Sequence, residues 1–168
     1  MFSSFSLLHA QSLRYSLAQP YIGLSVYSLA QHDPLSFSGN PAALAITKQL
    51  GAGIYGERRF MVKENSLYAG GITVPTRLGQ VGLLLNYAGF RNYNEQRVGL
   101  AYARALGSLL DAGIQFNYYA YRVPGYGGAS TVYAETGILL HPIDKWTLGV
   151  HACNPVGGNL GKSTSPFL

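Results

Sequence analysis

The sequence predicts an all-β fold, an antiparallel transmembrane β-barrel meander with a short N-terminal plug, or hatch, segment that contains one short helix. Three observations predict it: the composition, a strict alternation of polar and apolar side chains in about seven segments, and an alternation of short and long connections between them. Together they describe a sheet with one apolar face and one polar face.

The composition is unusual for a water-soluble domain. Only 11% of the 168 residues are charged, whereas Gly (21) and Tyr (13) are abundant. The mean hydropathy is only +0.10, and no apolar run approaches the roughly 20 residues that a membrane-spanning helix needs. A membrane barrel accounts for both facts, because half of the side chains in each strand face lipid and half face the lumen.

The charges and the single cysteine argue against other classes of protein. The net charge is +5, but Lys and Arg are scattered and form no basic stripe, so we expect no nucleic-acid partner. Cys153 is the only cysteine, which excludes an intrachain disulfide and a cysteine-based metal site. We expect it to lie as a small apolar residue inside or beside a strand.

The chain divides into four segments. Residues 1–10 resemble the remnant of a signal peptide, although they lack a basic start, and residues 11–47 form the irregular plug segment. The strands occupy 48–154, and 155–168 is expected to be a loop that leads to missing strands. An odd, open meander would leave backbone groups unpaired in lipid, so we expect an N-terminal fragment of a larger barrel, or a misassigned start.

One short helix is expected in the plug segment, between Ser38 and Ala45. Asn40 is a favourable N-cap, because its side chain can accept a hydrogen bond from the first helical turn. Pro41 follows at the first helical position, where its missing N–H costs nothing, and Ala42 begins an apolar stretch that continues the helix.

The clearest strand covers residues 110–121, about the length of a tilted membrane-spanning strand. Its apolar side carries Leu110, Ala112, Ile114, Phe116 and Tyr118, and its other side carries Asp111, Gly113, Gln115, Asn117 and Tyr119. Further alternating segments surround Val81–Tyr87, Val98–Ala103, Val132–Leu140 and Trp146–Ala152, and two weaker ones lie near Gln49–Glu57 and Ser66–Val74. This pattern predicts an antiparallel meander of about seven strands.

The connections between these strands are expected to alternate in length, as in outer-membrane barrels. The short ones are 75–79, 106–108 and 141–145, and the long ones are 58–65, 89–96 and 122–130. This asymmetry places an aromatic girdle at the outer rim, made of Tyr55, Tyr87, Phe90, Tyr118, Tyr119 and Tyr121. Trp146 is expected at the inner rim.

From about Gln19 onwards the chain resembles the long-chain fatty-acid transporter superfamily of outer-membrane barrels (FadL-like). It is most similar to the branch that contains PorV, the barrel of the type IX secretion system. The matching segments are 19–28, 33–45, 99–107, 111–119 and the Asn154-Pro-Val-Gly sequence. The sharpest match is Asn40-Pro41-Ala42, which corresponds to an Asn-Pro-Ala element in the region that plugs the barrels of this family.

The resemblance implies a barrel of about fourteen strands in the outer membrane of a Gram-negative bacterium. It implies a channel or transporter for hydrophobic solutes, or a scaffold component of protein secretion. The implied partners are outer-membrane lipid and either secretion-system proteins or hydrophobic small molecules, with no cofactor. The hatch motif Asn40, Pro41 and Ala42 then acts either as a gating element or simply as a capped helix that fills the lumen.

The polar side chains of the expected inner face are the candidate lumen-lining residues: Asp111, Gln115, Asn117 and Glu135. Two interpretations are open for them. They line a permeation path, or they hydrogen-bond to one another and to the plug.

Nothing in the sequence predicts an enzyme. The four histidines lack metal-ligand spacing, Gly-x-Ser-x-Gly is absent, and no pair of carboxylates is held at a defined separation. We therefore expect no catalytic residues and no metal. An alternative function remains, a soluble secreted β-sandwich or small barrel that binds a ligand or a glycan and packs its apolar face against a second sheet.

Overall fold

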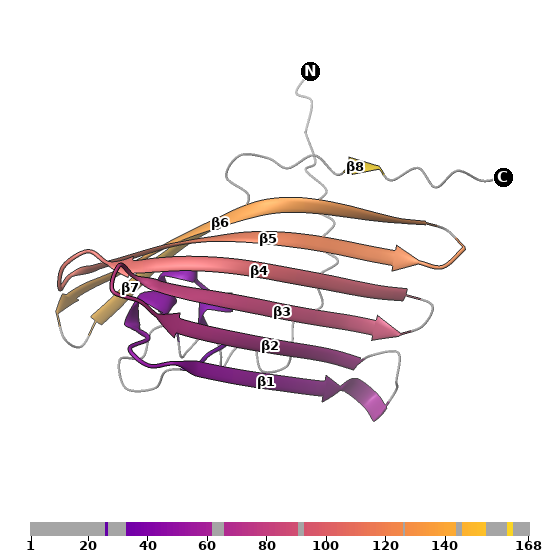
Figure 1. Ribbon diagram of the computed structural model, residues 1–168, viewed down its shortest axis with the longest axis horizontal. Helices are drawn as coiled ribbons and strands as arrows, with labels where there is room; N and C mark the ends of the chain where they lie inside the picture. Colours follow the sequence, from indigo (N-terminus) through magenta and orange to yellow (C-terminus); the bar gives the residue numbers. More distant parts are fainter. Residues whose placement is uncertain are drawn as a thin grey trace, which may run out of the picture.

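A single antiparallel sheet dominates the computed structural model, which describes residues 26, 33–61, 66–90, 93–125, 127–143, 146–153 and 161–162. The strand order β1-β2-β3-β4-β5-β6-β7 follows the chain, so each strand pairs with the one before it (Figure 1). The sheet is curled into a half-barrel, and the predicted all-β meander of about seven strands is confirmed.

The strands are β1 (Gly51–Arg58), β2 (Ser66–Pro75), β3 (Gln80–Phe90), β4 (Tyr93–Ala105), β5 (Leu110–Val123), β6 (Gly127–Ile143) and β7 (Trp146–Cys153). An eighth, two-residue strand, β8 (Gly161–Lys162), lies in the segment predicted as a loop and pairs with β6 at Ala129 and Ser130. The predicted signal-peptide remnant, 1–10, lies outside the described residues.

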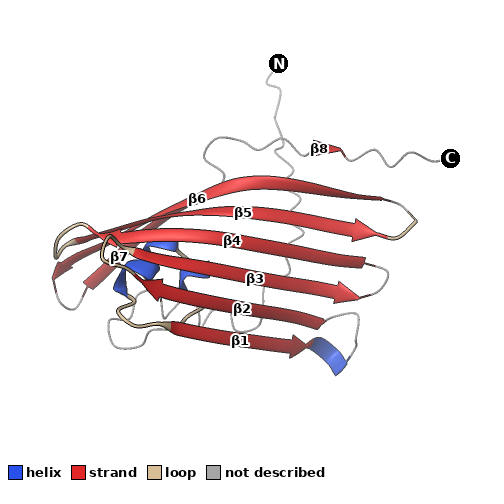
Figure 2. Cartoon of the chain, in the orientation of Figure 1, coloured by secondary structure: helices blue, strands red, loops and turns tan. Residues whose placement is uncertain are grey.

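Helical structure is limited to three short 3₁₀ helices, η1 (Ser36–Ser38), η2 (Pro41–Ile46) and η3 (Arg59–Met61), among the described residues (Figure 2). The helix predicted between Ser38 and Ala45 corresponds to η2 and starts at Pro41, as the N-cap argument required. None of the described helices is long and apolar enough to cross a bilayer.

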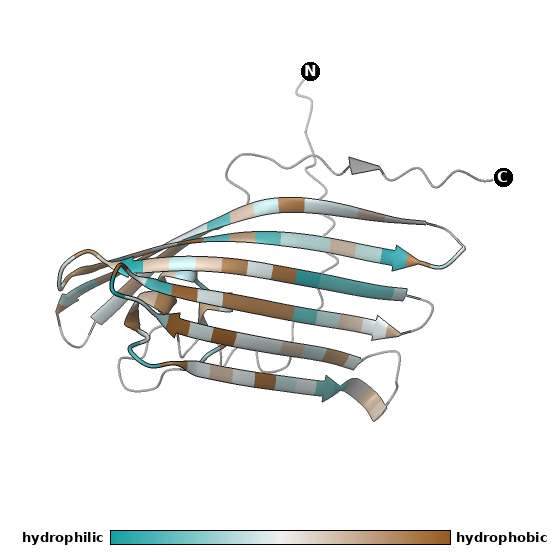
Figure 3. Cartoon of the chain, in the orientation of Figure 1, coloured by the Kyte–Doolittle hydropathy of each residue, from teal (hydrophilic) through white to brown (hydrophobic). Residues whose placement is uncertain are grey.

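The two faces of the sheet differ as the alternation predicts. On β5, Asp111, Gln115 and Asn117 are buried on the concave face, whereas Phe116 and Tyr118 are about half exposed on the outward face. Figure 3 shows apolar residues recurring along the middle of the strands. The segment with η1 and η2, residues 33–46, lies against part of the concave face, and we call it the plug.

The plug sits near one end of the sheet, which we call the plug end, where the connections 76–79 and 106–109 lie. At the opposite end, the far end, the predicted long connections 89–96 and 122–130 are wrong. There β3 and β4 pair as far as Phe90 and Tyr93, and β5 and β6 as far as Val123 and Gly127. Small and polar residues occur on both faces there, so the sequence shows no period-two alternation although the backbone pairing continues.

Of the residues predicted for an aromatic girdle, some lie on the outward face of the sheet and others do not. Tyr87 and Tyr118 are exposed on the outward face near the far end, and Trp146 is exposed at the plug end, 63% accessible. Tyr55 and Tyr119, however, lie on the concave face, because the strand register places them on the same side of the sheet as the buried residues. Tyr121 shares their side of the sheet, since it lies opposite the buried Glu95. Phe90 is half-buried at the last position of β3.

Candidate functional site

The plug is anchored by Asn40, which is only 2% exposed. Its side-chain Oδ1 accepts a hydrogen bond from the backbone N–H of Ala42 at 3.0 Å, and this bond caps η2. Its Nδ2 donates to the backbone carbonyl of Val150 in β7 at 3.3 Å. One side chain therefore starts the helix and ties it to a strand 110 residues away in the chain.

Glycines on the concave face let the plug lie directly against the sheet. Gly113 and Gly137 face each other across β5 and β6. A Cβ atom on Gly137 would overlap Oδ1 of Asn40, and one on Gly113 would lie 2.6 Å from the backbone nitrogen of Ala42. The hatch motif Asn40-Pro41-Ala42 is thus seated on a pair of glycines whose missing side chains make room for it.

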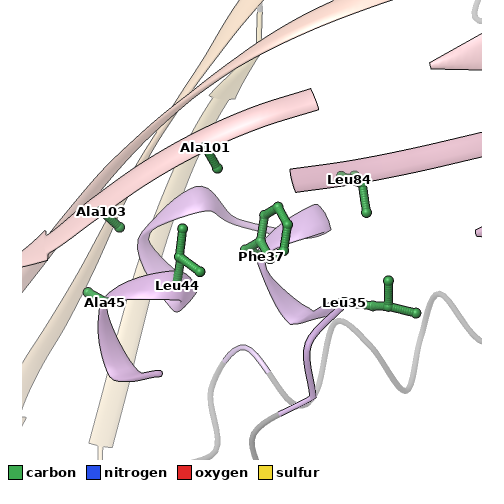
Figure 4. Close-up of a cluster of buried hydrophobic side chains, with 7 residues drawn as sticks. All are labelled: Leu35, Phe37, Leu44, Ala45, Leu84, Ala101 and Ala103. Carbon is green, nitrogen blue, oxygen red and sulfur yellow. The ribbon is translucent and has the colours of Figure 1, made fainter. Parts of the chain in front are cut away.

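A second set of contacts seats the apolar side of the plug. Phe37 and Leu44 are 1% exposed and pack towards β3 and β4, together with Leu35, Ala45, Leu84, Ala101 and Ala103 (Figure 4). A Cβ atom on Gly82 would lie 2.9 Å from Cζ of Phe37, so this glycine also accommodates the plug. The largest described hydrophobic core therefore lies between plug and sheet.

Polar side chains occupy the concave face beyond the plug. Gln115 and Asn117, on β5, are fully buried, and Nε2 of Gln115 donates to Oδ1 of Asn117 at 2.7 Å. Gly99 on β4 makes room for both, because a Cβ there would lie 2.6 Å from Asn117 Oδ1 and 2.7 Å from Gln115 Nε2. The two amides are therefore held against the sheet wall.

Glu135 is the centre of a charged group on β4, β6 and β7. It lies opposite Gln115 in the register, is 4% exposed, and has Nη1 of Arg97 3.9 Å from its Oε1. Nε2 of His151 lies 3.2 Å from its other oxygen. Arg97 supplies a positive charge that offsets the buried carboxylate.

Asp111 belongs to a separate group nearer the plug end. Its Oδ2 lies 2.9 Å from Nε2 of His141, and Nδ1 of the same ring lies 3.2 Å from Oγ1 of Thr147. The chain of contacts crosses β5, β6 and β7 and links the last strand of the meander to the two before it. It joins three strands of the sheet.

The structure thus places all four predicted lumen-lining residues on the concave face, in two groups. Gln115, Asn117 and Glu135 lie close together, whereas Asp111 is bonded elsewhere. Their contacts are with one another, with Arg97 and with histidines. The sequence did not single out Arg97, His141 and His151. All three have odd numbers on their strands and therefore share the concave face with the polar residues that were predicted.

Several buried polar atoms in this part of the concave face have no hydrogen-bond partner among the residues that the structure describes. They include Nδ2 of Asn86, Nε of Arg97, Oε1 of Gln115 and Nδ2 of Asn117. Buried polar atoms require partners, which water or a polar solute can supply. Among the described residues no group of three or more His, Cys, Asp or Glu side chains is placed to hold a metal ion.

Comparison with protein-family models, with the curated proteins and with the solved structures gives no match to this chain.

Proposed function

We propose that this chain forms part of an outer-membrane β-barrel, which acts as a channel or transporter for hydrophobic solutes or as a scaffold component of protein secretion. The observation that carries the proposal is the outward face of the sheet. On β1 to β7 the only charged residues at outward-facing positions are Arg58, Arg104 and Arg122, and all three lie near strand ends. Between them extends a belt of exposed apolar side chains that no described element covers.

The height of this belt fits a bilayer. On β5 the outward apolar positions run from Leu110 to Tyr118, eight residue steps, which is roughly 27 Å at about 3.4 Å per residue. With a strand tilt of about 40° the belt would be roughly 21 Å tall, close to the apolar band of outer-membrane barrels, about 25 Å.

The alternative, a soluble sandwich, requires the apolar face to be buried against a second sheet. In the described part of the chain the sheet packs the other face instead, since the plug and the polar groups occupy the concave side. Ile54, Val132 and Val150 are 95%, 61% and 66% exposed on the outward side. Such an extensive apolar surface favours lipid as its solvent.

The two edges of the sheet belong to the same proposal. Within the described residues β1 pairs only with β2, and β7 only with β6. Unpaired edges are costly in lipid, so the membrane form must pair both. Because β1 and β7 run in the same direction in an antiparallel meander, an odd number of further strands is needed to close the barrel.

Fractionation of cells that express the protein tests the proposal. We expect recovery in the outer-membrane fraction, resistance to extraction by alkaline carbonate, and release by detergent. Recovery in the soluble periplasm without detergent would contradict it and would favour the soluble binding module. An outer-membrane location leaves transport and secretion to be separated by measuring solute uptake and protein secretion in cells that lack the protein.

A further inference from the structure

A groove with several polar side chains in its lining lies at the far end of the sheet, immediately beyond the apolar belt. Its volume is about 530 Å³, and it is bordered by β4, β5, β6 and the hairpin at Pro124 and Gly125. On β4 it contacts Asn94 and Gln96 but not Glu95, which lies between them. Because alternate residues of a strand point to opposite faces, the β4 wall of the groove lies on the outward side. The lining from β5 and β6 is continuous, 120–123 and 127–130, so it includes the outward-facing Arg122 and Ser130 and also residues of the other face.

The groove consists of two cross-strand rows. In the outer row Asn94 lies opposite Arg122, which lies opposite Gly128. In the inner row Gln96 lies opposite Ala120, which lies opposite Ser130. The small residues Ala120 and Gly128 leave the hollow, and the longer polar side chains surround it.

The next row towards the plug end begins the apolar belt. It consists of Val98, Tyr118 and Val132, which are 42%, 48% and 61% exposed. Rows on one face are about 7 Å apart, so the groove lies within one or two rows of a surface suited to acyl chains. A ligand that spans both regions must combine a polar head with an apolar tail.

The charge of the groove selects the head. Arg122 is exposed, and none of the ion pairs among the described residues involves it. The amides of Asn94 and Gln96 and the hydroxyl of Ser130 add neutral hydrogen-bond donors. A guanidinium surrounded by such donors, with no carboxylate among the lining residues, complements a phosphate group.

We propose that this groove binds the phosphate headgroup of an anionic membrane lipid, with the acyl chains lying on the apolar belt below it. The inference rests on the proposed membrane location and adds a specific lipid contact to it. Arg122 binds the phosphate, Asn94, Gln96 and Ser130 donate hydrogen bonds to the headgroup, and Tyr118 marks the boundary between head and tail.

The experiment measures lipid retention by native mass spectrometry on the full chain purified in a nonionic detergent. Phosphatidic acid is the probe, and diacylglycerol, which lacks the phosphate, and glycerol phosphate, which lacks the acyl chains, are the comparison ligands. We expect Arg122→Gln to reduce the retention of phosphatidic acid about tenfold, since it removes a charge-assisted hydrogen bond. Ala120→Leu, which fills the hollow and keeps the arginine, should also reduce it.

Arg104→Gln is the matched control, because Arg104 also faces outward on the sheet but lies near the plug end of β4. Its retention of phosphatidic acid should equal that of the unmodified protein. Equal retention by Arg122→Gln, an equal loss in Arg104→Gln, equal retention of diacylglycerol, or full competition by glycerol phosphate would each overturn the inference. A protein that inserts into membranes but shows one of these results would refute only the lipid site, whereas a protein that stays soluble without detergent would refute the membrane proposal itself.

Discussion

Asn40 combines a local and a long-range role in one side chain. Its Oδ1 caps η2 through Ala42, and its Nδ2 reaches the carbonyl of Val150. The sequence predicts the cap, because Asn before Pro at the start of an apolar stretch is a common N-cap pattern. The bond to β7 depends on how the sheet curls around the plug, which no local pattern contains.

Removing the two roles separately is informative. We expect Asn40→Ala to lower the free energy of unfolding by about 1 kcal/mol or more, because both bonds are lost. Asn40→Ser retains a side-chain oxygen that can cap η2 and loses the donor to Val150, so it should lie between Asn40→Ala and the unmodified protein. Urea titration of the protein in lipid vesicles measures all three, and a Ser variant as unstable as the Ala variant would show that the cap contributes little.

The glycine seat gives a second prediction at this scale. Gly137→Ala places a Cβ atom where Oδ1 of Asn40 now lies, and it should cost about 1–3 kcal/mol through overpacking. Gly70→Ala is the control, because the nearest atom to a Cβ at that position is 3.9 Å away. Protease digestion should release the plug faster in the Gly137 variant only, and equal digestion of both variants would argue against a tightly seated plug.

At the scale of the elements, strands with one apolar and one polar face were the most predictable features. The strand predicted over 110–121 is β5, and the weak segments near Gln49–Glu57 and Ser66–Val74 are β1 and β2. The far-end hairpins were missed because small and polar residues occur there on both faces and give no alternation, although the strands continue to pair. The positions of Tyr55 and Tyr119 failed for a simpler reason, because closeness to a strand end does not determine the face.

The candidate site was predictable in part. Parity along β5 and β6 places Asp111, Gln115, Asn117 and Glu135 on the concave face. Their partners could not be predicted, because they come from register between strands: His141 reaches Asp111, and His151 reaches Glu135. The seat for the plug was equally hidden, since a glycine in a strand has several causes and only the contact shows which applies.

A charge in the middle of the belt tests the assignment of the outward face. Phe116→Arg should destabilise the protein folded in lipid vesicles by about 2–4 kcal/mol, because the guanidinium would lie near the middle of the bilayer. Leu109→Arg is the control, since Leu109 is 58% exposed in a turn at the plug end, where we expect about 0–1 kcal/mol. If urea titrations showed equal losses of stability in both variants, the outward face at Phe116 would not lie deeper in the bilayer than the turn at Leu109.

In the molecule as a whole, the sheet buries many polar side chains on its concave face and exposes apolar side chains on its outward face, the reverse of a water-soluble protein. The concave side, with its plug, buried amides and His–carboxylate pairs, provides the described interior, and the outward side carries the exposed apolar residues. A water-soluble protein would bury the second surface. In a bilayer the same arrangement is stable once both sheet edges are paired, because lipid solvates the belt and the backbone groups of the strands bond to one another.

Tyr118 and Tyr119 allow the most direct test, because they are consecutive on β5 and point to opposite faces. In a Trp146→Phe background, which removes the single tryptophan, Tyr118→Trp and Tyr119→Trp each introduce one fluorophore. After reconstitution into vesicles of lipid with brominated acyl chains, we predict strong quenching of tryptophan fluorescence at position 118 and little at position 119. Equal quenching at the two positions, or none at either, would contradict the claim that the outward face of this sheet lies against lipid.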